Sequence, residues 1–321
     1  MKKHFVTFAT AAAMASPMAV MAGNDWDFYG QLGYEVQVKD ADISDRDGLD
    51  QMSYGSRLGF KGSAPMDNGM TGIWQVESAL TVPGGTLSAR NSYAGIQGDF
   101  GTILGGNHDT PHKRAGLGFY GGDNLLFDAG TGASAAWGFR TFEFSRWQSL
   151  QYHSPDMGGL RFEAALSGDG DAAEEEDWVD ISAGIFFNQG PLSVTAAYTS
   201  TDDGDTTNML VSGQFDAGML TVGLAYESNS AIDDPFGVAT AGEFDLDRML
   251  VTAKADLGGG TFANLFLKMD DFEDDVVDGD ATDFGLIAGQ HLGGGTQVYG
   301  AVASAMDGEA TNLGFGLRHH W

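Results

Sequence analysis

Two histidines stand beside residues with which they could form a hydrolytic pair, since His153 precedes Ser154 and His108 precedes Asp109. Neighbouring residues of a β-strand point to opposite faces of the sheet, so His153 and Ser154 could not converge on one substrate. The chain also contains no G-x-S-x-G segment, the turn that exposes the nucleophilic serine of many hydrolases. We therefore interpret these histidines as polar residues of strands and expect no enzyme activity.

Glycines and acidic residues form two further patterns with chemical meaning. Gly116, Gly118 and Gly121 match G-x-G-x-x-G, but no β-α-β unit precedes them, so a nucleotide site is not indicated. Acidic residues are concentrated at residues 169–177, 202–205, 233–247 and 270–283. None of these clusters has the ligand spacing of a calcium-binding EF-hand loop. We expect no cofactor, with weak Ca²⁺ or Mg²⁺ binding to acidic external loops left open.

Four basic residues lie in segments whose polar and apolar positions alternate. In one such segment Phe60 takes the apolar face, so Arg57 and Lys61 must share the other face, and the same alternation places Arg90 and Arg146. If the apolar face meets lipid, a guanidinium turned outward would cost about 2 to 4 kcal/mol at the bilayer midplane. The four cations are therefore predicted to face the interior.

Sixteen segments with this alternation are predicted to be β-strands. The first, Asp25 to Lys39, is longer than the strands of about 5 to 6 residues in soluble sheets, and exceeds the roughly 9 to 11 residues that cross a bilayer. The predicted strands are 25–39, 53–62, 72–81, 89–97, 101–107, 148–154, 160–167, 179–188, 191–200, 207–216, 219–228, 248–257, 261–269, 282–292, 296–303 and 310–321. The pattern predicts an all-β fold, a 16-stranded antiparallel transmembrane β-barrel.

Composition supports this fold class. The chain has 48 glycines, 21 phenylalanines and 7 prolines, which suit strands and turns, whereas each glycine in a helix costs roughly 1 kcal/mol. Its 45 acidic and 16 basic residues give a formal net charge of -29, which argues against binding to nucleic acid by simple electrostatics. With no cysteine in the sequence, neither disulfides nor thiolate zinc sites are available.

The beginning of the chain indicates export. Lys2 and Lys3 precede an apolar stretch from Phe5 to Val20, followed by the small residues of a cleavage site. We expect residues 1–22 to be a signal peptide and residues 23–321 to form the barrel. No later stretch supplies the ~20 consecutive apolar residues of a transmembrane helix. The predicted location is the cell outer membrane.

One connection is far longer than the others. It runs from His108 to Trp147, and a loop of roughly 40 residues in a compact domain is usually functional or disordered. Its aromatic residues are Trp137, Phe139, Phe142 and Phe144. Because these give the loop apolar surface with which to pack, we expect it to fold into the barrel. The remaining connections alternate between tight turns and longer polar loops, as in outer-membrane barrels.

The chain ends within a strand, on an aromatic residue. Leu313, Phe315, Leu317 and Trp321 share one face of the last segment. A terminal aromatic ring belongs in the interfacial girdle of a membrane barrel. Trp321 is predicted to close the barrel and to act as the membrane-insertion signal for the barrel assembly machinery.

Four segments of the chain resemble the general bacterial porins of the kind found in Neisseria and other proteobacteria. They are SRLGFKG at 56–62, RNSYAGIQGDFGTILGG at 90–106, SRWQSLQYHSP at 145–155 and GLRHHW at 316–321. The chain departs from the family at Trp321, where Phe is usual, at Gln148, where Asn is common, and in its more acidic external loops. The resemblance implies a trimeric outer-membrane channel for passive diffusion of ions and small hydrophilic solutes.

The resemblance also implies a narrow constriction, where an infolded third external loop faces a basic wall. The wall would contain Arg57, Lys61, Arg90 and Arg146, and the loop Asp123, Asp128 and Glu143. A transverse field between them would admit small dipolar solutes and hydrated ions. In the alternative arrangement, Arg57 and Lys61 merely pair with Glu77 and neighbouring acids of the wall, and the lumen stays polar.

Two classes of function stay open. The acidic loops of a channel predict cation preference at low salt, which weakens as the Debye length shortens. The alternative is a non-conducting exported barrel, such as an adhesin or a structural outer-membrane protein. Stepwise conductance and heat-modifiable trimer bands belong only to the channel. The predicted partners are a homotrimer, outer-membrane lipid and lipopolysaccharide, the barrel assembly machinery, and small hydrophilic solutes and ions, with no nucleic acid.

Overall fold

The structure is a computed structural model that describes residues 25–39, 48–53, 55–82, 84–117, 141, 145–168, 179–201, 204–232, 244–273, 279–305 and 310–321. The expected signal peptide, residues 1–22, lies outside the described residues and stays a prediction. None of the helices found in the described ranges is both long enough and apolar enough to span a bilayer.

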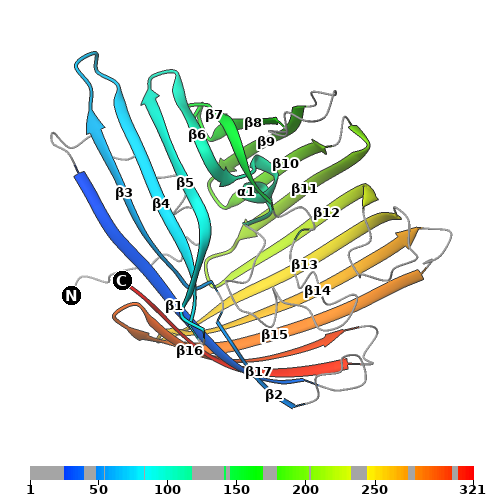
Figure 1. Cartoon of the computed structure of the whole chain (residues 1–321). Coiled ribbons are helices and arrows are strands. Elements are labelled where there is room, and N and C mark those ends of the chain that lie inside the picture. The colour runs from blue at the N-terminus through cyan, green and yellow to red at the C-terminus, as the bar shows by residue number, and fades with distance from the viewer. Residues whose placement is uncertain are drawn as a thin grey trace.

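Seventeen strands form one antiparallel sheet that closes on itself (Figure 1). They are β1 (Asp25–Lys39), β2 (Gly48–Met52), β3 (Arg57–Pro65), β4 (Thr71–Thr81), β5 (Thr86–Gly98), β6 (Gly101–Asp109), β7 (Arg146–His153), β8 (Leu160–Gly168), β9 (Val179–Gln189), β10 (Leu192–Thr201), β11 (Thr206–Asp216), β12 (Leu220–Ile232), β13 (Phe244–Gly258), β14 (Thr261–Glu273), β15 (Gly279–Gly293), β16 (Thr296–Ala305) and β17 (Ala310–His320). The helix α1 (Pro111–Leu117) follows β6.

The strands β2 and β3 are two parts of one strand of the barrel. Both pair with β1: β2 with residues 35–39, and β3 with residues 25–31. On its other edge β1 pairs with β17, so the sheet has no free edge. Counting β2 and β3 together gives the sixteen-stranded antiparallel barrel that the alternation predicts, and this prediction is confirmed.

The interruption between β2 and β3 was not predicted, since the sequence indicated one strand from residue 53. Gly55 adopts a positive φ of 60°, which turns the chain. The Ser56 hydroxyl then accepts a hydrogen bond from the Gly33 amide at 2.8 Å and donates to the Gly33 carbonyl at 3.0 Å. One side chain thereby replaces the backbone bonds that β1 would otherwise receive. The alternation would place Ser56 on the same face as Phe60, toward lipid, but Ser56 is buried.

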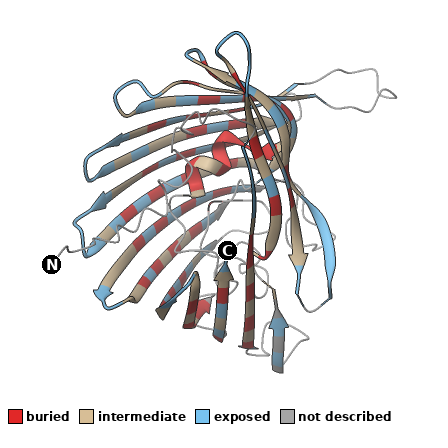
Figure 2. Cartoon of the chain, turned by 90° about the vertical axis from the view of Figure 1, so that its left-hand side faces the viewer, coloured by how far each residue is buried: buried red, intermediate tan, exposed pale blue. Residues whose placement is uncertain are grey.

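The outer surface of the barrel is apolar. Large hydrophobic side chains are exposed on every described strand except β16, among them Phe28, Val211, Leu265 and Phe315. Exposed and buried residues alternate along the strands, as Figure 2 shows. A continuous exposed apolar surface of this extent marks contact with another apolar phase, and for a closed barrel that phase is the hydrocarbon of a membrane.

The inner surface carries polar side chains and, unexpectedly, two groups of buried apolar ones. One group comprises Ala115, Phe186, Ala197, Leu210, Ala225 and Leu250. The other comprises Phe266, Ile287, Tyr299, Ala301 and Ala303. Because Ala115 belongs to α1, the first group places the helix inside the barrel, where α1 packs against β8 to β11 (Figures 1 and 2). The beginning of the long connection thus lies inside, and residues 118–140 fall outside the described residues.

The barrel closes at the end of the chain. The amide and carbonyl of Trp321 pair with those of Gly30 at 3.2 and 3.3 Å. The Trp321 indole lies over Gly30, where any Cβ would come within 2.2 Å of the ring, and it is 6.2 Å from the Phe28 ring. Trp321 is therefore part of the seam between the first and last strands. Its predicted role as an insertion signal stays a prediction.

Candidate functional site

Three of the predicted basic residues line up on the inner wall across neighbouring strands. Glu77 of β4 lies between Arg57 of β3 and Arg90 of β5, with Arg90 Nε at 2.6 Å from one carboxylate oxygen and Arg57 Nε at 3.8 Å from the other. Asp109 of β6 in turn contacts Nε of Arg146 of β7 at 2.8 Å. Cations and carboxylates therefore alternate from β3 to β7.

A β-bulge lets β5 contribute two consecutive side chains to this wall. The pairing of β4 with β5 shifts its register at Glu77, so Arg90 and Asn91 both stand opposite that one residue. The Asn91 amide donates to Oδ2 of Asp109 at 2.9 Å, and Nε of Arg146 donates to Oδ1 of Asn91 at 3.1 Å. Bulges commonly re-aim side chains in this way. Asn91 thus connects the group around Glu77 to the group around Asp109.

A tyrosine supports Glu77 from the first strand. The Tyr29 hydroxyl donates to Oε2 of Glu77 at 2.9 Å, and its ring lies over Gly59, where an added Cβ would come within 2.6 Å of the ring. The same arrangement recurs where the Tyr299 hydroxyl donates to Oε2 of Glu35 at 2.7 Å above a glycine of the next strand. Glycine is required beneath each ring because any side chain would displace it.

A fourth cation reaches the wall from α1. Nζ of Lys113 lies 2.7 Å from Oδ1 of Asp109, the same oxygen that Arg146 contacts. The pKa of Lys113 is lowered to about 8, mainly by burial. Arg146 and Arg90 also lower this pKa, whereas Asp109 raises it. We call this set the basic row: Arg57, Glu77, Arg90, Asp109, Lys113 and Arg146. Four cations and two carboxylates leave a formal excess of two positive charges (4 − 2) when Lys113 is protonated.

The arginines of the basic row lie closer to the open interior than the acids do, whereas the side chain of Lys113 is buried. The arginine side chains are 27%, 19% and 23% exposed at Arg57, Arg90 and Arg146, whereas those of Glu77 and Asp109 are only 7% and 6% exposed. A solute inside the barrel would therefore meet guanidinium groups first, with the carboxylates beneath them.

The other predicted site residues lie apart from the basic row or outside the described residues. Lys61 stands four residues further along β3, about 13 Å from Arg57 at the usual rise of a strand. It pairs with Asp27 at 3.8 Å and lies over the Tyr29 ring at 5.2 Å. The predicted loop acids Asp123, Asp128 and Glu143 lie outside the described residues. Arg57 pairs with Glu77 and Lys61 with Asp27, as the alternative arrangement expected. The predicted constriction between a basic wall and the acids of the loop stays a prediction.

Sequence reasoning missed Lys113 and a second charged group on the opposite wall. Nε and Nη2 of Arg248 donate to the two oxygens of Asp270 at 2.7 and 2.8 Å. Nζ of Lys268 lies 2.7 Å from Asp283 and 3.3 Å from Asp270. We call Arg248, Lys268, Asp270 and Asp283 the buried quartet, since none of these side chains is more than 4% exposed. The alternation that places Arg57 on the inner face applies to these strands as well, and it could have predicted the buried quartet.

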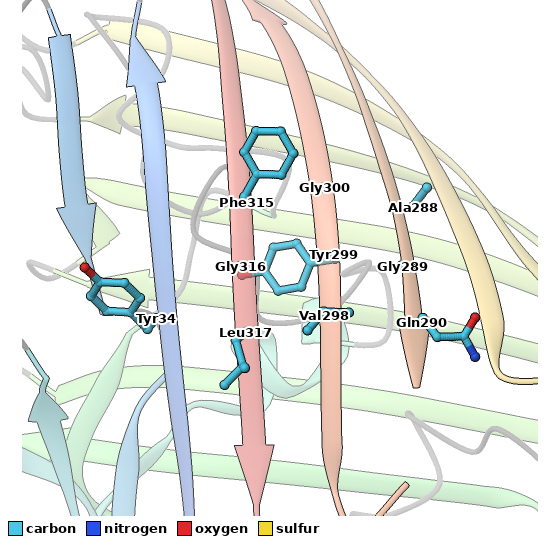
Figure 3. A pocket seen from close by; sticks show the side chains of 10 residues that line it. All are labelled: Tyr34, Ala288, Gly289, Gln290, Val298, Tyr299, Gly300, Phe315, Gly316 and Leu317. Carbon is cyan, nitrogen blue, oxygen red and sulfur yellow. The ribbon is translucent and has the colours of Figure 1, made fainter. Parts of the chain in front are cut away.

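An apolar groove of about 500 Å³ lies elsewhere, over β1, β15, β16 and β17 (Figure 3). Its lining includes Tyr34, Ala288, Gly300, Phe315 and Leu317. Ala288, Gly300 and Phe315 are aligned across three neighbouring strands, so the small residues leave a gap between larger ones. Phe315 and Leu317 belong to the exposed outer face, which places the groove on the apolar side of the wall, away from the basic row.

Comparisons with known proteins agree with this architecture. The sequence model of a family described as Gram-negative porin matches residues 9–310. The major outer membrane protein P.IB of Neisseria gonorrhoeae is 30% identical over 169 residues, which are 50% of this chain and 46% of that protein. The chain thus matches about half the length of such relatives. A monosaccharide porin of Halomonas sp is 26% identical over 332 residues, covering 88% of this chain and 85% of that protein.

Solved structures share the fold. An anion-selective porin from Comamonas acidovorans superposes with a TM-score of 0.73 at 18% identity, covering 93% of this chain and all of that one. The trimer form of OmpT, an outer membrane protein of Vibrio cholerae, gives a TM-score of 0.69 at 18% identity, again over 93% of this chain and all of the other.

Proposed function

Because the chain belongs to the Gram-negative porin family, an outer-membrane family of channels rather than enzymes, we propose that it forms a water-filled channel. The channel would carry ions and small hydrophilic solutes across the outer membrane by passive diffusion. The observation that carries the proposal is the basic row: a closed barrel with an apolar exterior holds partly exposed guanidinium groups on its inner wall.

The partial exposure of the arginines indicates that the interior of the barrel contains water and is not a sealed core. A charged group sealed in a closed core has lost its contact with water and must be paired to offset that cost. The exposed fractions of about one fifth to one quarter at Arg57, Arg90 and Arg146 mean that water reaches these groups inside the wall. Polar and charged linings of this kind let hydrated solutes pass and exclude apolar ones.

A solute would meet two regions of opposite charge one after the other, the acidic clusters and the basic row. The acidic clusters of the chain favour cations at low salt, whereas the excess of two positive charges in the basic row favours anions inside. Exposed charges are screened by salt more than partly buried ones. We expect cation preference in dilute salt that declines, and turns toward anions, as the salt concentration rises.

Recording from planar lipid bilayers tests the proposal. The purified chain should give stepwise conductance increases, and its reversal potential in a salt gradient should move toward anion preference as both salt concentrations increase. A barrel that inserts without conductance steps would overturn the proposal and leave a non-conducting outer-membrane barrel. A reversal potential that does not depend on salt would contradict the account of selectivity.

The assembly we propose is a homotrimer. The support is the solved trimer form of the Vibrio cholerae protein, whose fold this chain shares. A trimer band on a gel that converts to monomer on heating, together with chemical cross-linking to three copies, tests it. Lipopolysaccharide, the barrel assembly machinery and removal of residues 1–22 as a signal peptide remain part of the same proposal.

A further inference from the structure

Three consecutive side chains of α1 contact carboxylates on three different strands. The contacts are Lys113 with Asp109 of β6 at 2.7 Å, Arg114 with Glu163 of β8 at 2.8 Å, and His112 with Glu227 of β12 at 3.1 Å. The first two lie on the side of the basic row. The third lies beyond β9, β10 and β11, against which the helix packs.

The contact between His112 and Glu227 is sealed from water. The two side chains are 0% and 1% exposed. The His112 amide donates to the Ser182 hydroxyl at 3.2 Å, while Nδ1 of the ring is buried without a hydrogen-bond partner. Leaving a buried ring nitrogen unsatisfied costs free energy. The contact with Glu227 offsets that cost, so the position of His112 is tied to this one carboxylate.

Contacts with carboxylates hold α1 on two sides. Lys113 and Arg114 attach it to β6 and β8, where Asp109 and Glu163 also meet the wall residues Arg146 and Arg161. Between these sides the helix packs against β9 to β11, and the Thr195 hydroxyl donates to the Ala115 carbonyl at 3.4 Å. Of the three carboxylate contacts, only that of His112 lies on the β12 side, so its loss leaves this side of the helix held by packing and neutral hydrogen bonds.

We propose that His112 and Glu227 are positioning residues that hold α1 against the wall between β9 and β12 and so keep the space beside the basic row open. This inference rests on the proposed channel function. It concerns how the helix is held, and it assigns neither residue a contact with solute.

Single-channel recording of substituted chains tests the inference. In His112→Leu, which has no ring nitrogen, the steady open level should be lost and replaced by flicker between levels. His112→Gln keeps an N–H donor and should retain the steady level. Asp283→Asn is the matched control, because it removes an equally buried carboxylate that contacts Lys268 and not α1. A steady level in His112→Leu, or equal flicker in Asp283→Asn, would overturn the inference.

A chemical bridge provides a test that a folding defect cannot imitate. The chain has no cysteine, so His112→Cys with Glu227→Cys introduces the only thiols. A short bis-methanethiosulfonate forms one disulfide with each thiol, releasing methanesulfinate each time, and this bridge should restore the steady level. Reduction of the two disulfides by dithiothreitol should abolish the steady level again. Flicker that persists in the bridged channel would overturn the inference. If the unsubstituted chain gives no conductance at all, the proposed function itself fails.

Discussion

The basic row and the buried quartet use the same side chains in different ways. Each alternates cations with carboxylates across neighbouring strands on the inner wall. The arginines of the row are about one fifth to one quarter exposed and the row has two positive charges in excess, whereas the quartet is sealed with two cations and two acids. A sealed group has to be neutral because unpaired buried charge is costly, but a wetted group can keep an excess. The two groups differ in burial and in net charge more than in composition, and these two properties distinguish the wall that solutes meet from the sealed one.

The largest effect is expected from breaking the quartet. Asp270→Leu leaves Arg248 and Lys268 facing each other without the carboxylate between them, and loss of one partner of a buried ion pair costs about 3 to 5 kcal/mol. Denaturant titration of the folded barrel would measure the loss. The matched change in the row is Arg57→Leu, which should cost less than about 1 kcal/mol because that side chain is partly exposed. Equal losses would erase the distinction between the two groups.

The tyrosine that supports the row gives a smaller effect. In Gly59→Ala the added carbon overlaps the Tyr29 ring and strains the hydrogen bond from this tyrosine to Glu77. As at other overpacked sites, the free energy of unfolding should fall by about 1 to 3 kcal/mol. The change should lower the midpoint of denaturant unfolding. Gly105→Ala serves as control, because nothing lies within 4 Å of the position of its new carbon. A tolerated alanine at residue 59 would mean that the tyrosine does not hold Glu77 in place.

Removing single cations from the row should change selectivity with little loss of stability. Arg146→Gln halves the formal excess of two charges, so the reversal potential should move toward cations. Lys268→Gln in the quartet is the comparison, since its side chain is sealed and should change stability without changing selectivity. A larger selectivity shift from residue 268 would reverse the assignment of the two walls.

The smallest effect is a pH dependence of the row. Lys113 loses its proton near pH 8, so raising the pH from 7 to 9 should reduce the excess from two charges to one and move the reversal potential toward cations. The unfolded chain keeps that proton up to its ordinary pKa of 10.5, so between these two values the free energy of unfolding rises with pH. Lys113→Arg should remove the contribution of residue 113 to the pH dependence of the reversal potential and of the free energy of unfolding. A pH profile that this substitution leaves unchanged would contradict the assignment of the titration to Lys113.

The sequence predicted the strands well because the two faces of each strand meet different surroundings. The strand from Asp25 to Lys39 has the predicted bounds, and most others agree to within a few residues. The break before β3 could not be predicted, since it depends on the Ser56 hydroxyl binding Gly33, 23 residues away. Strict alternation would place only one of Arg90 and Asn91 inside, because it does not include a bulge. The helix α1 is short and is positioned by wall carboxylates distant in sequence, so no local pattern indicates it.

The seam between β1 and Trp321 sets the order of events in folding. The first strand completes its backbone hydrogen bonds only with residues nearly 300 positions away in the sequence. Until these segments meet, two strand edges are unpaired, and such edges invite aggregation. We therefore expect closure to be a late event in folding, and a chain truncated before Trp321 to lack the two hydrogen bonds that join Trp321 to Gly30.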